Sequence, residues 1–226
     1  MTPPLALPGA AAAGLLAGVL IDITLYRVAR DLPMRANMWR RYVAVLLATP
    51  TLYVALTVRF GVTLALPAYV YLATVGLLLA MLDFHVRRLP DAIVLPSYVI
   101  TLLILMPAGA AAGDWGPAQR ALGGLAAFVI MFFALAVAYP HAVGFGDVKL
   151  AGLLGIHLAW LGWSTLLIGV LGSFVLVGFG GVALSGSRRG AAATVPFAPC
   201  LIGASVLALF VTVPITTWYG SILGLA

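Results

Sequence analysis

Two aspartates stand where charge meets a long apolar run, and these are the residues best placed for chemistry. Asp83 follows the uncharged run 62–82, and Asp147 ends the segment Gly-Phe-Gly-Asp (144–147) just ahead of another apolar run. Two carboxylates within a few ångströms share one proton, because both cannot ionise in a low-dielectric site. Such a pair suits water-mediated peptide hydrolysis, since the ionised carboxylate takes a proton from water and the protonated one polarises the scissile carbonyl.

The two glycines before Asp147 suggest how a substrate could reach it. Gly144 and Gly146 flank a single residue, and glycine admits left-handed or strained dihedrals and the close approach of a second chain. We therefore expect an irregular backbone at this point, with room for an extended peptide beside the carboxylate.

A simpler interpretation is that each aspartate pairs with a nearby cation. Arg87 lies four residues after Asp83, and Lys149 lies two residues after Asp147. For either aspartate alone, the sequence does not decide between pairing and catalysis. No Ser/His/Asp or Cys/His arrangement competes, since no serine stands in a nucleophile-elbow context.

The composition is that of an integral membrane protein. Of the 226 residues, 64% are hydrophobic and 8% charged, and the mean hydropathy of +1.17 excludes a disordered chain and an ordinary soluble domain. The net charge of +6 suits an anionic membrane face, but it is too dispersed for nucleic acid to be an expected partner. A single cysteine permits neither a disulfide nor a cysteine zinc cage, so we expect no metal.

Stretches of about 20 apolar residues, the length that crosses a bilayer, indicate the fold. We predict an all-α polytopic protein with about eight transmembrane helices and one integral-membrane domain, 1–226. A hairpin near Gly162 divides the longest run. The expected spans are Pro8–Leu25, Tyr42–Val58, Val62–Leu82, Ala92–Met106, Ala121–Ala138, Val148–Leu161, Ser164–Leu184 and Val195–Val213.

The basic residues predict the orientation. If eight spans alternate, ten of the 12 lysines and arginines fall on one side, and only Arg59 and Arg120 fall on the other. The positive-inside bias makes the richer side cytoplasmic, so both termini face outward and Asp83 and Asp147 lie at the cytoplasmic face.

Four segments resemble the type IV prepilin peptidases in the order of that family. Residues 82–96, in which Asp83 is followed eight residues later by the aspartate of a Leu-Pro-Asp turn, resemble the first catalytic region, and residues 144–150 are similar to the GxGD region. The Pro-Phe-Ala-Pro segment 196–199 resembles a late Pro-Phe-Gly-Pro motif, and residues 18–27 resemble an early stretch that ends in Tyr-Arg.

This resemblance implies an intramembrane aspartyl endopeptidase of the cell (inner, cytoplasmic) membrane, with Asp83 and Asp147 as the dyad. The implied substrates are prepilins or pseudopilins of type IV pilus and type II secretion systems, cleaved at the cytoplasmic face. It also implies that proteolysis needs no cofactor. The chain does not indicate an oligomeric state.

Further residues are candidates for shaping this site: Gly144, Gly146, Lys149, Pro90, Asp91 and Arg87. Lys149 could attract an acidic residue of the substrate or only set the membrane topology. Arg87 could anchor the helix end at the cytoplasmic face or lower the pKa of Asp83. Asp91 follows Pro90 and precedes an apolar run, which predicts a helix N-cap. Asp22 stands where the family usually has asparagine; it could hydrogen-bond a neighbouring helix or bind substrate or cofactor.

One departure from the family concerns methylation. Larger members carry a cysteine-rich cytoplasmic loop with paired CxxC motifs, whereas the segment 27–41 has no cysteine. Many members also N-methylate the new amino terminus with S-adenosylmethionine, an activity associated with the N-terminal region. We therefore expect S-adenosylmethionine to bind only if methylation is retained.

The rival function is a small multispan proton-coupled transporter that uses Asp83 and Asp147 as a proton relay. Such a protein would be expected to show an internal repeat or carboxylates near the middle of the membrane. The sequence has neither feature, which favours the peptidase.

Overall fold

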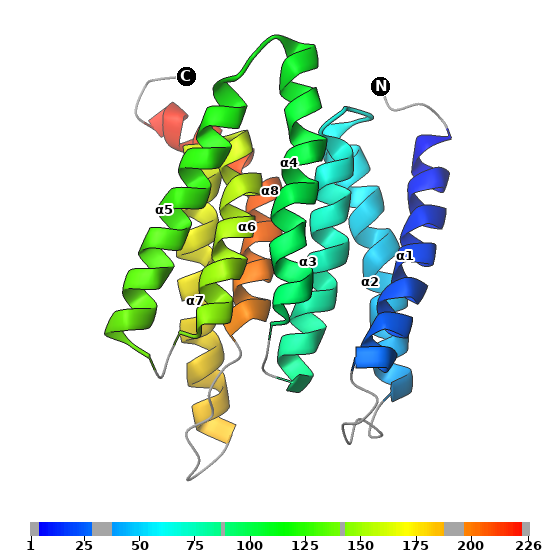
Figure 1. Ribbon diagram of the computed structural model, residues 1–226, viewed down its shortest axis with the longest axis vertical. Coiled ribbons are helices and arrows are strands. Elements are labelled where there is room, and N and C mark those ends of the chain that lie inside the picture. Colours follow the sequence, from blue (N-terminus) through cyan, green and yellow to red (C-terminus); the bar gives the residue numbers. More distant parts are fainter. Residues whose placement is uncertain (1–4, 29–37, 87–88, 141–142, 188–196, 223–226) are drawn as a thin grey trace. The chain divides into compact units, whose positions relative to one another are not determined.

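The computed structural model describes residues 5–28, 38–86, 89–140, 143–187 and 197–222. All the regular structure within these ranges is helical (Figure 1), which confirms the predicted fold class. Each expected span falls on a helix of its own. The helices are α1 (Ala6–Val28), α2 (Met38–Phe60), α3 (Leu66–Val86), α4 (Asp91–Ala112), α5 (Gly116–Ala138), α6 (Phe145–Leu161), α7 (Trp163–Ser187) and α8 (Phe197–Ile222).

Six of these helices, all but α6 and α7, are long and apolar enough to cross a bilayer. The apolar part of α7 within the described residues is the shorter segment Trp163–Phe179. Helix α6 has 17 residues, slightly fewer than the ~20 that a full span needs. The chain is thus a multi-pass membrane protein, and the outward orientation of its termini stays a prediction.

Several predicted helix ends were wrong because proline was given too much weight as a boundary. Helix α4 continues through Pro107 and ends only before Gly113, where φ is +66°. Helix α8 likewise runs through Pro214. A proline removes one backbone donor, and the apolar residues beyond it still favour a helix inside the membrane, where every other backbone group must be hydrogen-bonded.

The chain forms two compact units, residues 1–113 and 114–226. Helices α1 to α4 make up the first unit, and helices α5 to α8 make up the second. A single peptidase domain over 1–226 stays a prediction.

Close backbone contact and hydrogen bonds between helices hold the first unit together. A β-carbon at Gly14 of α1 would lie 2.5 Å from the Cα of Pro50 in α2, so only glycine permits this approach. The hydroxyl groups of Tyr53 and Thr74, 2.7 Å apart, link α2 to α3. A second hydroxyl pair, on Tyr71 and Ser97, links α3 to α4 at 2.8 Å.

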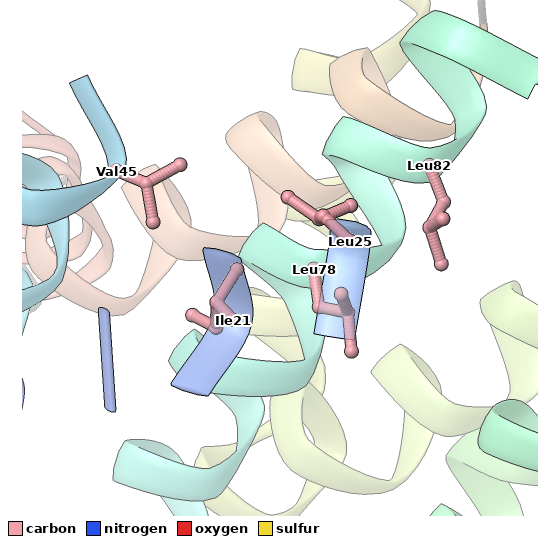
Figure 2. Close-up of a cluster of buried hydrophobic side chains, with 5 residues drawn as sticks. All are labelled: Ile21, Leu25, Val45, Leu78 and Leu82. Atoms are coloured by element: carbon pink, nitrogen blue, oxygen red, sulfur yellow. The ribbon is translucent and has the colours of Figure 1, made fainter. Parts of the chain in front are cut away.

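A cluster of aliphatic side chains fixes which helix ends meet in the first unit (Figure 2). Ile21 and Leu25, near the end of α1, pack with Leu78 and Leu82, near the end of α3. Val45, near the start of α2, completes the cluster. The end of α1, the start of α2 and the end of α3 therefore share one end of this unit.

The second unit is built around α6. Its side chains are buried from Leu150 to Trp160, because α5, α7 and α8 all pack against it. A β-carbon at Gly155 of α6 would lie 2.5 Å from the carbonyl oxygen of Gly124 in α5, so these two helices cross in near backbone contact. This enclosure offsets the shortness of α6, because neighbouring helices surround it instead of lipid.

Two features complete the second unit. Gly162 joins α6 to α7 with φ of +154°, a conformation that suits glycine, and it confirms the predicted hairpin. Three phenylalanines then tie the start of α8 to its neighbours: the Phe197 ring centroid lies 5.6 Å from that of Phe132 in α5 and 6.2 Å from that of Phe174 in α7.

Candidate active site

Asp83 lies in the last turn of α3 and is almost fully buried. Its side chain is 9% exposed, next to Leu82 at 1%, whereas the following Phe84 is 68% exposed. Burial of a carboxylate removes hydration and costs free energy unless polar or charged groups compensate. Asp83 thus has the burial expected of a functional group and not that of a solvated surface charge.

Two more aspartates lie at the same end of the first unit. Asp22 is on the turn of α1 that contains Ile21 and Leu25, which pack against the Asp83 end of α3. A hollow of about 410 Å³ is lined by Asp22, Ile23, Tyr26 and Arg27. The start of α4, with Asp91, is here too, because Ile93 packs against the same aliphatic cluster. This agrees with the predicted placing of the connections 27–41 and 84–90 on one side.

The prediction that Asp91 is an N-cap was wrong by one position. Pro90 is the N-cap of α4, with extended backbone and no side-chain capping bond, and Asp91 is the first helical residue. The Pro90 carbonyl accepts the N–H of Ile93 at 3.0 Å. Asp91 is exposed, so its favourable contribution to α4 is that of an anion near a helix N-terminus.

Asp147 occupies the first turn of α6, and its surroundings differ from those of Asp83. It is the third residue of the helix after the N-cap Gly144, and its Oδ2 accepts a hydrogen bond from the Gly144 N–H at 3.1 Å. The side chain is partly exposed, in a turn that also holds the exposed Phe145 and the buried Val148. Asp147 is therefore positioned by the backbone at the point where its own helix begins.

The expected irregular backbone at the glycines was wrong. Gly144 has φ −85° and ψ 157°, an ordinary extended conformation, and Gly146 is already inside α6. A β-carbon at Gly144 would meet only Asp147 Oδ2, at 3.6 Å, and the Gly146 nitrogen, at 4.0 Å. A β-carbon at Gly144 would thus be in ordinary contact and without backbone strain, and the close approach of a substrate to Asp147 stays a prediction.

The structure does not extend to every predicted site residue. Lys149 is half-buried in the first turns of α6, and its role stays a prediction. Arg87 and His141 lie outside the described residues. Asp83 and Asp147 belong to different units, so their pairing as a dyad also stays a prediction. Among the described residues, no group of three His, Cys, Asp or Glu side chains could hold a metal ion.

The feature that sequence reasoning missed is the Gly144 amide as a hydrogen-bond donor. The signal was present, because glycine is an accepted N-cap and an acidic residue three positions later is the arrangement of a capping box. The conformational freedom of glycine favoured a strained turn instead of this N-cap.

Within the described residues, eight helices, with Asp83 near the end of α3 and Asp147 near the start of α6, define a multi-pass membrane protein with carboxylates at helix termini. A family model described as the type IV leader peptidase family matches residues 70–182, which include both Asp83 and Asp147. The chain belongs to this family, whose members are aspartic peptidases, and the resemblance found from the motifs is confirmed.

Individual relatives agree with this assignment. The prepilin leader peptidase/N-methyltransferase of Bacillus subtilis is 31% identical over 79% of this chain and 69% of its own length. A Pseudomonas putida protein of the same name is 31% identical over 75% of this chain, which spans only 58% of that relative. Leader peptidase HopD of Salmonella typhimurium is 33% identical over 61% of this chain and 88% of its own length. No solved structure matches the chain.

Proposed function

We propose that this protein is an intramembrane aspartic endopeptidase that removes the short leader of prepilins or pilin-like secretion proteins, with Asp83 and Asp147 as its catalytic pair. The carrying observation is that the family match spans residues 70–182 and includes Asp83, in the last turn of α3, and Asp147, in the first turn of α6. The relatives described above are peptidases by name, so the transporter alternative gains no support.

The chemistry needs a carboxylate and a carboxylic acid on either side of the scissile peptide bond. The ionised aspartate takes a proton from water, whose oxygen bonds to the carbonyl carbon, while the protonated aspartate donates its proton to the carbonyl oxygen. Collapse of the tetrahedral intermediate breaks the C–N bond, the leaving amine takes the proton that the first aspartate removed from water, and the second aspartate regains a proton from a hydroxyl of the intermediate. General acid–base catalysis of this kind contributes about 10²- to 10⁴-fold for each group.

The position of the aspartates at helix ends supports a substrate that crosses the membrane boundary. In the first unit, Asp83 is near the end of α3, whereas residues such as Tyr69 and Leu72 lie further back along that span. A peptide bond just outside the apolar part of a substrate helix would meet Asp83 at this depth. We place the reaction at the cytoplasmic face of the inner membrane, where the basic connections are predicted to lie.

N-methylation of the new amino terminus is a separate activity. The names of the Bacillus and Pseudomonas relatives include this activity, whereas the name of the Salmonella relative does not. With one cysteine, this chain cannot form the paired CxxC motifs of larger members. We propose that proteolysis requires neither metal nor S-adenosylmethionine, so chelators should leave cleavage intact.

The test is co-expression with a candidate prepilin. Wild-type protein should shorten the substrate by the length of its leader, as resolved by gel and by mass measurement of the new N-terminus. The same mass measurement detects a methyl group if one is added. Absence of cleavage for every prepilin-type substrate, with inserted and detergent-stable protein, would refute the proposed function.

A further inference from the structure

The amide of Gly144 has an unusual arrangement with the side chain that it faces. Its N–H donates to Oδ2 of Asp147 at 3.1 Å, while the Gly144 carbonyl accepts the N–H of the same residue, Asp147, at 3.0 Å. Two reciprocal bonds between one pair of residues fix the Asp147 side chain relative to the helix start. No side-chain atom of residue 144 is involved in either bond.

This contact favours the ionised form of Asp147. A carboxylate accepts a hydrogen bond from a backbone N–H more strongly than a neutral acid does, because charge-assisted bonds are about twice as strong. The position adds to this preference, since Asp147 stands in the first turn of α6 and an anion is stabilised at a helix N-terminus.

We propose that the Gly144 N–H is a positioning group for catalysis, which fixes the Asp147 carboxylate at the start of α6 and keeps it as the ionised member of the pair, the one that takes the proton from water. The inference rests on the proposed function. In a dyad that shares one proton, it follows that Asp83 carries the proton and polarises the scissile carbonyl.

The other titratable side chains at this end of the second unit titrate at higher pH than a carboxylate does. Within the described residues they are Lys149 on α6, Tyr139 after α5 and Cys200 near the start of α8. The ordinary pKa values of lysine, tyrosine and cysteine lie above ~8. With His85 and His141 replaced by glutamine in the test background, a change of the acid limb between variants that differ only at position 144 would therefore report the carboxylates.

The experiment compares variants that differ at the amide. Gly144→Pro removes the N–H, and the observed φ of −85° is near the value that proline fixes, ~−65°. Gly144→Ala keeps the N–H and adds a β-carbon that meets only ordinary contacts. Incorporation of glycolic acid at position 144 replaces the N–H by oxygen with no added bulk, so the test survives if the proline variant does not insert.

Removal of the N–H should lower kcat by about tenfold or more, the factor that corresponds to ~1.4 kcal/mol, with little change in KM. The acid limb of the kcat profile should move up by about one pH unit, because Asp147 then protonates more readily. Alanine should leave the acid limb in place. If the glycolate variant keeps the wild-type limb and kcat, the positioning role is refuted while the peptidase stands; if wild-type protein cleaves nothing, the proposed function itself fails.

Discussion

The two units carry the same residue type at opposite ends of a helix. Asp83 closes α3, enclosed at 9% exposure, whereas Asp147 opens α6 and is held there by a backbone amide. The exposed amides of a helix lie at its N-terminus and the exposed carbonyls at its C-terminus, so the two carboxylates meet different electrostatic surroundings. Chain direction, and not residue type, can therefore give two aspartates two roles.

The comparison requires that both aspartates face the same compartment, which is an all-or-none condition. Single cysteines placed at positions 36, 88, 142 and 188 of a Cys200→Ser background should all react with an impermeant thiol reagent only from the cytoplasmic side. The positive-inside bias is the physical reason. If positions 88 and 142 report opposite sides, Asp83 and Asp147 cannot act on one peptide bond.

The next largest effect is expected from the aspartates themselves. Asp83→Asn and Asp147→Asn should each lower cleavage by about 10²- to 10⁴-fold, because an amide neither takes nor shares the proton. In the Asp147→Asn variant, the side-chain carbonyl oxygen can still accept the Gly144 N–H, so the start of α6 should survive. Cleavage of a prepilin is measured per unit of membrane-inserted protein. Near-normal activity of either variant would refute the proposal that Asp83 and Asp147 form the catalytic pair.

Glycines in the second unit separate packing from catalysis. Gly155→Ala should destabilise the protein by about 1–3 kcal/mol, because its β-carbon would lie 2.5 Å from the Gly124 carbonyl oxygen. Gly144→Ala meets no such contact and should melt close to wild type. Gly144→Val carries more bulk beside Asp147 and should reduce cleavage without a matching loss of stability.

Thermal unfolding in detergent and cleavage per folded molecule distinguish these variants. If the activity of Gly144→Val falls only in proportion to folded protein, the glycine serves packing and not the approach of substrate. If Gly155→Ala melts like wild type, the tight crossing of α5 and α6 is not required.

Much of this fold could be predicted from the sequence. Hydropathy gives the length of each apolar run, and the charged residues show where each run ends. The hairpin at Gly162 was predictable because a run about twice the length of one span must turn near its middle. The continuation of α4 through Pro107 and of α8 through Pro214 was not predictable. A proline removes one backbone donor, and the sequence does not show that the hydrophobic gain of a longer helix outweighs this loss. The enclosure of α6 and the Gly124–Gly155 crossing depend on neighbours distant in sequence.

The candidate site, too, could be predicted only in part from the sequence. Asp83 and Asp147 stand out because a carboxylate beside an apolar run has a high desolvation cost. The spacing of Gly144 and Asp147 contained the capping interaction, but residue types alone favoured a strained turn. The direction in which each helix runs from its aspartate was also available, because Asp83 follows an apolar run and Asp147 precedes one; the Gly144 N–H contact to Asp147 is what only the structure shows.

The smallest expected effect concerns Asp91, which tests whether an aspartate near Asp83 is interchangeable with it. Asp91 is the first residue of α4 and exposed, so Asp91→Asn removes a negative charge near a helix N-terminus and keeps a polar side chain of the same size. The interaction of that charge with the helix N-terminus is worth about 0.3–1 kcal/mol, and cleavage should remain within about twofold of wild type. Melting temperature and prepilin cleavage are measured alongside Asp83→Asn. Equal loss of activity in the two variants would move the first catalytic position from the buried end of α3 to the exposed start of α4, and the contrast between enclosed and capped aspartates would no longer describe the active site.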